Sequence, residues 1–397
     1  MRGISVPGLT RGCCECNILV TRSPIIYQTR VIMKVGVFVP VYKESEQLKP
    51  LLKALIADPY KDKEIVVCAD EPTERTRALI AETGGVVWRV SEERLGKVNA
   101  LNAAVAEHPC DVIVFLDSDI EVRQEGFIGR VIEEMDDFDL IEIKKKIIRD
   151  SFVARIVNYD YLSANFTNLV FSKYLGRCLG FNGSAFAIKR EAWGSLNGFG
   201  KEICEDLDMA TRAYIGGLRF GYAEATEVYN KVSPSWRVWV RQRRRWAAGQ
   251  AHWLTSRYMM LLDSIVSHPK VLFASLLIIF PSLPMFAATL AFPDTLYVNA
   301  VSFVFLLVAG KELLFIPPIV AMLTGVATFK AFAAFLAVFS IFAVVFYYFA
   351  RRLGYAFSLP EFAFFFIVYN PLWLTISIAT LFRVIIWRNG FNLDWKI

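Results

Sequence analysis

The sequence predicts an α/β domain followed by a helical, membrane-embedded region. Across residues 34–263, short β-branched runs alternate with helical patterns and charges are frequent, which is typical of a strand–helix–strand fold. From about residue 271 to 387, Phe, Leu, Ile, Val and Ala dominate. Runs of roughly 20 such residues form membrane helices. A chain of 397 residues has room for about two domains.

Strand-like segments and helical patterns alternate through the first part of the chain. Strands are expected over 35–39, 64–68, 86–90 and 111–116, and helices over 48–56, 75–82 and 95–107. This alternation predicts a parallel, doubly wound sheet, which binds ligands at the carboxyl ends of its strands. Because Pro40, Asp70 and Asp117 lie at such ends, we expect them to converge on one crevice. The chain lacks G-x-G-x-x-G, so a dinucleotide-type phosphate loop is not expected.

Net charge limits the class of partner. The formal charge is +6, and much of it comes from one cluster, made of Arg237, Arg241, Arg243, Arg244 and Arg245. An apolar tract follows this cluster directly, which favours anionic lipid headgroups or a nucleotide diphosphate as its partner. No nucleic-acid-binding motif accompanies it, so we expect no nucleic-acid partner.

The first 32 residues do not fit the pattern downstream. They contain Arg, Pro and Gly and lack a long apolar core, so a signal peptide is not expected. We predict a disordered leader, with Met33 as a candidate natural start. Cys13, Cys14 and Cys16 have no second Cys/His pair nearby, and the other cysteines are scattered, as in a reducing cytosolic domain.

Three short motifs carry chemistry, and they occur in a fixed order. Asp117-Ser118-Asp119 offers carboxylate oxygens to a hard cation. Glu205-Asp206 supplies a candidate general base. Gln242-Arg243-Arg244-Arg245-Trp246 combines diphosphate-binding groups with a flat aromatic face for a sugar. The order suggests chemistry on an anionic donor at a bilayer surface.

With their neighbours, these motifs resemble the family 2 glycosyltransferases, which are inverting enzymes with the GT-A fold. Residues 39–44 look like the family motif P-x-Y-N-E, with Lys43 in place of Asn. Residues 64–76 look like E-I-I-V-V-D-D-G-S-T-D-G-T, although Ala69 and Glu71 differ from that pattern. Residues 96–102 match G-K-x-x-A-L-N. The final motif fits Q-x-x-R-W, the mark of the processive, membrane-embedded branch, which includes hyaluronan, chitin, cellulose and poly-N-acetylglucosamine synthases.

The resemblance implies a role for each motif. Asp119, with Asp117, would hold Mg²⁺ or Mn²⁺. Asp206 would be the general base, with Glu205 or Asp208 as alternatives. The nucleotide sugar would be bound by Pro40, Tyr42, Glu44, Asp70, Lys97, Asp117, Gln242 and Arg245. The acceptor would be bound by Trp246, Gly183 and Ser184.

The rest of the basic-aromatic region is expected to anchor the chain at the membrane. Arg243 and Arg244 would face lipid headgroups. Trp236, Trp239 and Trp253 would anchor interfacial amphipathic helices over 236–268. A catalytic domain over 33–235 would then lie in the cytosol, ahead of a transmembrane region over 269–397.

We predict about four membrane spans, over 270–292, 297–323, 329–350 and 361–387. Lys311-Glu312 would line an acceptor path or mark a helix break. The expected activity is sugar transfer from a nucleotide-diphosphate sugar, either elongating a polysaccharide or modifying a lipid. A transporter with a nucleotide-sensing domain is the distant alternative, and a homo-oligomer would supply further spans.

Overall fold

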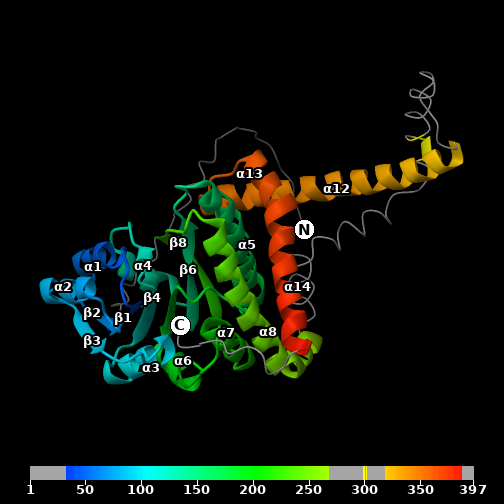
Figure 1. Ribbon diagram of the computed structural model, residues 1–397. Helices are drawn as coiled ribbons and strands as arrows, with labels where there is room; N and C mark the ends of the chain where they lie inside the picture. Colours follow the sequence, from blue (N-terminus) through cyan, green and yellow to red (C-terminus); the bar gives the residue numbers. More distant parts are fainter. Residues whose placement is uncertain (1–32, 268–297, 300, 302–317, 387–397) are drawn as a thin grey trace, which may run out of the picture. The chain divides into compact units, whose positions relative to one another are not determined.

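The computed structural model describes residues 33–267, 298–299, 301 and 318–386 (Figure 1). The predicted leader with its three cysteines, the span over 270–292 and Lys311-Glu312 lie outside the described residues, as does most of the span over 297–323.

One mixed sheet of eight strands forms the centre of the domain, in the order β3-β2-β1-β4-β7-β6-β8-β5. The strands are β1 (Val35–Tyr42), β2 (Lys63–Asp70), β3 (Val87–Ser91), β4 (Val112–Leu116), β5 (Ile120–Glu121), β6 (Leu140–Ile147), β7 (Ala185–Lys189) and β8 (Phe220–Asn230). The first four are parallel neighbours, which confirms the α/β prediction for this half. The prediction of a wholly parallel sheet was wrong, because β7 runs antiparallel to both β4 and β6.

The antiparallel strand has a direct consequence for function. It pairs Ala185 at its start with Leu116 at the end of β4, and the Asp117 N–H donates to the Ser184 carbonyl at 2.8 Å. Asp117 and Ser184, which are 67 residues apart in sequence, therefore meet at the carboxyl end of the parallel strands, where ligands bind in such sheets.

Helices cover the two faces of the sheet. They are α1 (Leu48–Ala57), α2 (Glu74–Glu82), α3 (Lys97–Glu107), α4 (Phe127–Glu134), α5 (Phe152–Leu175), α6 (Arg190–Ser195) and α7 (Glu205–Ile215). The first core cluster joins α1 and α4 to one face, through residues such as Leu52 and Phe127. The second joins α3, α6 and α7 to the other face, through residues such as Leu101 and Met209.

Local sequence explains where individual helices begin and end. In α1, the buried Leu48, Leu51, Leu52 and Leu55 have the spacing of one helix face. Ser151 caps α5, because its side chain accepts a hydrogen bond from the Ala154 N–H. Gly176 ends the same helix in the left-handed conformation that glycine adopts most readily.

Further helices follow the sheet: α8 (Trp236–Ser267), α12 (Pro318–Leu353), α13 (Leu359–Phe364), the π-helix η1 (Phe365–Tyr369) and α14 (Asn370–Ile386). A third core cluster packs α5 against these helices around Tyr159 and Phe362. Two segments, Gly325–Leu353 and Leu359–Ile386, are long and apolar enough to cross a membrane. They coincide with the predicted spans 329–350 and 361–387.

Candidate functional site

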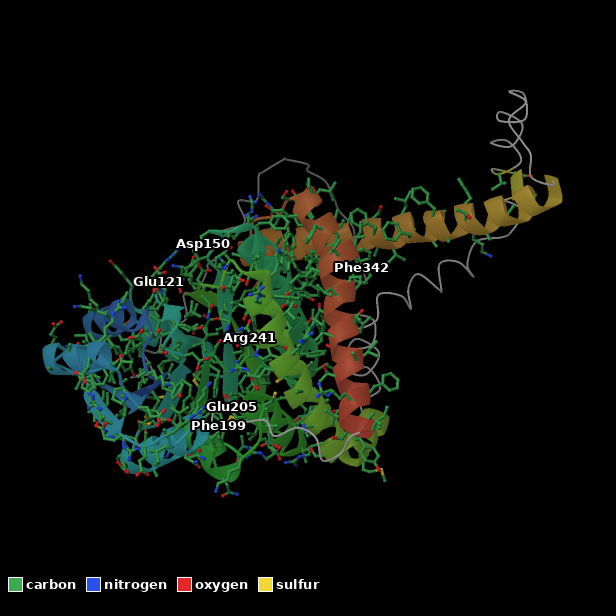
Figure 2. The ribbon with its side chains drawn as sticks, viewed as in Figure 1. Glu121, Asp150, Phe199, Glu205, Arg241 and Phe342 are labelled. Atoms are coloured by element: carbon green, nitrogen blue, oxygen red, sulfur yellow. The ribbon has the colours of Figure 1, made fainter. Side chains whose placement is uncertain are left out.

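Lys97 joins three of the sequence motifs. Its ammonium lies 2.9 Å from Asp117 Oδ1 and 3.0 Å from Glu205 Oε1. Loss of hydration opposes its charge, but the two carboxylates raise the pKa of Lys97 well above its usual value. The G-K segment, the D-x-D and the E-D pair therefore meet at one point. Glu205 at the start of α7 and Arg241 on α8 are marked in Figure 2.

Asp70 holds the loop that carries Lys97. Its two oxygens accept hydrogen bonds from the Leu95 N–H at 2.9 Å and the Gly96 N–H at 2.8 Å. Gly96 has φ +81°, a conformation that favours glycine, and α3 starts at the next residue. Asp70 is 7% exposed, so the structure gives it a loop-ordering role, and its contact with the nucleobase stays a prediction.

The candidate metal-binding carboxylates lie at the end of β4. Although Asp119 is exposed, the surrounding protein reduces its hydration, and this effect together with the charge of Asp117 raises the pKa of Asp119. Asn230 at the end of β8 donates a hydrogen bond that opposes this shift. Two carboxylates that repel each other are a suitable donor pair for a hard cation. Within the described residues no group of three or more His, Cys, Asp or Glu side chains is placed to hold a metal ion.

The donor set nevertheless fits Mg²⁺ or Mn²⁺. Such ions are commonly held in nucleotide sites by one or two carboxylates, with phosphate oxygens of the substrate as further ligands. Asp117 and Asp119 match that arrangement.

Asp206 lies against the acceptor-side segment. Its Oδ2 accepts the Gly183 N–H at 3.1 Å, and its Oδ1 accepts the Leu207 N–H at 2.8 Å. Loss of hydration, followed by the charge of Glu205, raises the pKa of Asp206 to about 6. A carboxylate with such a pKa is ionised near neutral pH and basic enough to take a proton.

Asp208 is committed to a structural role. It is 1% exposed and pairs with Arg212 and Arg257, each at 2.8 Å. Its two charge partners come from α7 and α8, so it holds these helices together. Of the acidic residues at the start of α7, Glu205 and Asp206 remain candidates for the base.

Two residues of this region were missed by sequence reasoning. Glu142 on β6 is 1% exposed and accepts hydrogen bonds from Asn168 and the Asn182 N–H. Loss of hydration raises its pKa to about 8. Lys145 on the same strand is 4% exposed and contacts Asn182 and Ser184. The available signal was a glutamate and three consecutive lysines inside a strand whose other residues are leucine and isoleucine.

The remaining predicted nucleotide contacts lie at the end of β1. Tyr42 is 40% exposed, and the Arg94 guanidinium lies 4.7 Å from the centre of its ring. Glu44 Oε2 accepts a hydrogen bond from Thr73 at 3.0 Å. Pro40 is half-buried in β1. Arg94, which the motifs did not single out, extends this surface with a cation.

The predicted Q-x-x-R-W segment lies on α8, which is one continuous helix. Gln242 and Arg245 are exposed there, and Trp246 is half-buried. One turn beyond Arg245, a Cβ on Gly249 would lie 2.3 Å from Cys204 Sγ. The helix thus packs directly on the residue that precedes Glu205.

Three anchoring assignments were wrong. Arg243 is 3% exposed and forms an ion pair with Asp160 of α5. Trp239 is 3% exposed and its indole N–H donates to the Tyr369 hydroxyl, while the Trp253 indole N–H donates to Thr211. The sequence spacing suggested an interfacial helix, but α8 packs against α5, α7 and α14, so these side chains face protein.

The opposite side of α8 is basic. Arg237, Arg241 and Arg244 line an open cavity of about 430 Å³ together with Trp236 and Val240. The arginines recur at the spacing of one helix face. Among the described residues, none of them has a carboxylate within 4.0 Å. Contact of Arg244 with lipid headgroups therefore stays a prediction.

Part of the chain is similar to a known protein family. The model of the glycosyl transferase family 2 matches residues 36–190. Residues 36–190 form a family 2 glycosyl transferase domain. The matched segment contains the G-K, D-x-D and Asn182–Ser184 residues, whereas Glu205 and α8 lie beyond it.

Several curated proteins are similar over the longer stretch. "Probable glycosyltransferase YdaM" of Bacillus subtilis is 26% identical over 243 residues, which are 55% of this chain and 56% of that protein. The poly-beta-1,6-N-acetyl-D-glucosamine synthase of Staphylococcus aureus is 25% identical over 215 residues, 52% of each chain. A probable glucomannan 4-beta-mannosyltransferase of Arabidopsis thaliana is 26% identical over 54% of this chain and 44% of that protein. The chain thus spans about half the length of these relatives.

A solved structure supports the fold. The mannosyltransferase PcManGT of Pyrobaculum calidifontis, in complex with GDP-Man and Mn²⁺, aligns with a TM-score of 0.50 and 20% identity. The alignment covers 77% of this chain and 86% of that one. The GT-A architecture expected from the motifs is therefore confirmed.

Proposed function

We propose that this protein is a membrane-integrated, inverting glycosyltransferase that transfers a sugar from a nucleotide-diphosphate sugar to an acceptor hydroxyl. The observation that carries the proposal is the junction at Lys97, which contacts Asp117 and Glu205 together. It brings the candidate cation site and the candidate base to the same end of the sheet. A nucleotide-binding loop, a cation site and a base in one place are what sugar transfer from a diphosphate donor requires.

In this proposal Asp117 and Asp119 hold Mg²⁺ or Mn²⁺, which when bound neutralises charge on the donor diphosphate as a Lewis acid. Lys97 adds a cation on the same side. Gln242 and Arg245, exposed on α8, would bind the diphosphate from the helix that packs on Cys204. The nucleoside would lie along Tyr42, Glu44 and the Asp70 loop.

Asp206 then removes the proton of the acceptor hydroxyl as its oxygen attacks the anomeric carbon. A single displacement inverts that carbon and releases the nucleoside diphosphate. Gly183 orients the base through its N–H, and Ser184 and Trp246 would position the acceptor sugar. The raised pKa of Asp206 suits this task, because a more basic carboxylate is the better proton acceptor.

We further propose that the enzyme acts at a membrane and elongates a polysaccharide. The two apolar helices expose large side chains, among them Val344 at 68% and Phe382 at 61%, and exposed apolar surface of this kind suits lipid. Two of the similar proteins are named as a polysaccharide synthase and a glucomannan mannosyltransferase. A catalytic domain in the cytosol would take the donor from the cytosolic pool.

The test uses membranes containing the full chain and a panel of radiolabelled nucleotide sugars. A ladder of products supports polymerisation, whereas one chloroform-soluble product indicates single transfer to a lipid. Asp206→Asn should abolish transfer and leave donor binding nearly intact. Excess chelator should also stop transfer. Wild-type membranes that transfer none of the sugars would contradict the proposed function.

A further inference from the structure

Lys145 is a buried lysine beside the acceptor-side turn, and the mechanism above does not use it. The residue is 4% exposed. Its ammonium lies 3.1 Å from Asn182 Oδ1, within hydrogen-bond distance of Ser184 Oγ, and 4.8 Å from the centre of the Tyr161 ring. No carboxylate of the described residues lies within 4.0 Å of it. Its hydrogen-bond partners are neutral, and its charge acts on Asp119 and Glu142 only from beyond ion-pair distance, so its burial is costly and calls for a function.

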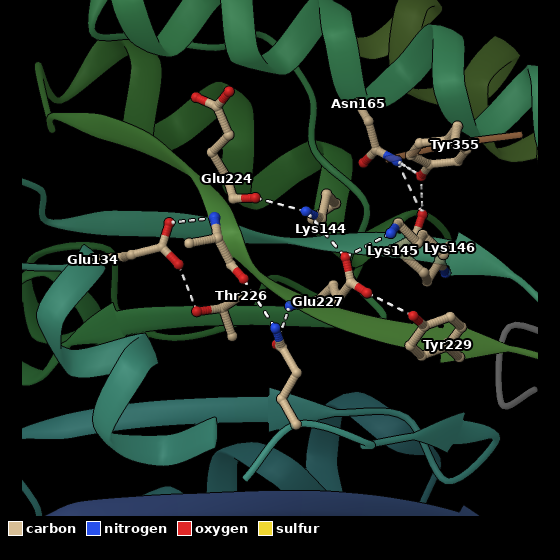
Figure 3. A network of polar contacts seen from close by, with 12 residues as sticks. Glu134, Lys144, Lys145, Lys146, Asn165, Glu224, Thr226, Glu227, Tyr229 and Tyr355 are labelled. Carbon is tan, nitrogen blue, oxygen red and sulfur yellow. Dashed lines mark hydrogen bonds and ion pairs between the residues drawn. The ribbon is translucent and has the colours of Figure 1, made fainter. Parts of the chain in front are cut away.

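The neighbouring lysines of β6 are used differently. Lys144 and Lys146 both pair with Glu227, at 3.1 Å and 2.7 Å (Figure 3). The backbone carbonyl of Lys145 accepts hydrogen bonds from Asn165 and Tyr355, which fix the strand at this residue (Figure 3). Of the three consecutive lysines, only Lys145 extends its ammonium to the Asn182–Ser184 turn.

The turn itself depends on the oxygen that Lys145 contacts. Asn182 Oδ1 also accepts hydrogen bonds from the Ser184 N–H at 3.2 Å and the Ser184 hydroxyl at 2.7 Å. The Asn182 N–H donates to Glu142 at 3.3 Å. Between these fixed residues lies Gly183, whose N–H donates to Asp206. A short chain of hydrogen bonds therefore connects Lys145 to the proposed base.

We propose that Lys145 is a positioning residue for Asp206, because it holds the Asn182–Ser184 turn in the form that presents the Gly183 N–H to the carboxylate. This inference rests on the proposed function, in which Asp206 is the base. Loss of the lysine releases the turn and weakens a hydrogen bond to the ionised carboxylate. Such a loss raises a carboxyl pKa and misplaces the proton acceptor.

Other charged groups surround Asp206 and contribute to the same pH response. They are Glu205 on α7, Lys97 on α3 and Glu142 on β6. None of them is removed in the variants below. Lys145→Met removes the lysine charge as well as its contacts, whereas Ser184→Ala keeps that charge, so a shift in Ser184→Ala reports the turn.

The experiment compares Lys145→Met and Lys145→Arg with Lys146→Met, a matched control that removes the same charge from the next residue of the strand. Transfer is measured in membranes against pH, with the nucleotide sugar that the wild type uses, and donor affinity is measured by calorimetry. Lys145→Met should lower kcat about 10- to 100-fold, keep donor affinity within about twofold, and move the acid limb of the pH profile upward. Lys145→Arg should recover part of kcat, and Lys146→Met should keep the wild-type limb.

An unchanged limb and kcat in Lys145→Met would overturn the inference, as would a loss confined to donor affinity. If Lys145→Met fails to fold, Ser184→Ala, which keeps the lysine and removes its partner, should shift the limb in the same direction. An unshifted limb in Ser184→Ala then contradicts the inference. Hydrogen exchange at the Gly183 amide should accelerate in both variants, and this readout does not depend on activity. An inactive wild type therefore counts against the proposed function. Unchanged hydrogen exchange at the Gly183 amide in the variants counts against the positioning role of Lys145.

Discussion

The Gly183 N–H donates a hydrogen bond to Asp206 Oδ2 at 3.1 Å, and a Cβ on Gly183 would lie 2.5 Å from the Asp206 Cβ. The absence of a side chain at residue 183 is therefore a steric requirement for this approach. This contact joins the acceptor-side turn to the proposed base. Adding a single methyl group at residue 183 tests it.

Gly183→Ala should reduce kcat about 100-fold or more, because the added methyl displaces Asp206 by a distance that catalysis does not tolerate. Donor affinity should change little, since the nucleotide residues lie on other segments. Gly194→Ala is the matched control, because a Cβ there meets nothing within 4 Å. Full activity in Gly183→Ala would disprove the close approach.

The pH profile of kcat/KM should report the free base. Asp206 must be ionised to accept a proton, and burial with the charge of Glu205 raises its pKa to about 6. Activity should therefore be present above about pH 6 and fall as the pH decreases through that value. Steady-state rates from pH 5 to 8, with the acceptor kept below its KM and the donor saturating, measure the acid limb of this profile. Glu205→Gln should move the acid limb to lower pH, because the charge that raises the pKa of Asp206 is lost. An unmoved limb would show that Glu205 does not act on the base.

Packing between α8 and α7 should control the position of Gln242 and Arg245. Gly249→Ala places a methyl group 2.3 Å from Cys204 Sγ, so the helix must shift and transfer should fall about tenfold or more. Cys204→Ala removes the sulfur, and the double variant should regain much of the activity. If the two changes are simply additive, the contact does not position the helix.

The buried Arg243–Asp160 pair should stabilise the packing of α8 on α5. Arg243→Met removes the ion-pair partner of Asp160, which keeps its hydrogen bond from the Tyr369 hydroxyl, and should lower the free energy of unfolding by about 3 kcal/mol. Arg237→Met, at an exposed residue of the same helix, should change it by less than about 0.5 kcal/mol. Thermal unfolding of the detergent-solubilised protein measures both. Equal effects would show that Arg243 is not part of the protein core.

Sequence reasoning was most accurate where a local rule applied. The runs of β-branched residues located β1 to β4, because their hydrophobic periodicity is a property of neighbouring residues. The apolar content of the C-terminal third located the two long helices in the same way. Sequence reasoning was less accurate for Arg243 and Trp239. Helical spacing predicts which residues share a helix face, but it does not predict whether lipid or protein covers that face. The partners that bury them, Asp160 and Tyr369, are 83 and 130 residues distant in sequence.

The sequence by itself determined the α/β class, the apolar helices and the identity of the acidic and basic motifs, all of which follow from local composition and order. Only the tertiary structure decided which groups meet. The antiparallel entry of β7 brings Ser184 to Asp117, the loop at Gly96 aims Lys97 between two carboxylates, and Lys145 reaches the Asn182–Ser184 turn. These contacts depend on strand direction and chain crossover, which are set by the packing of the whole sheet.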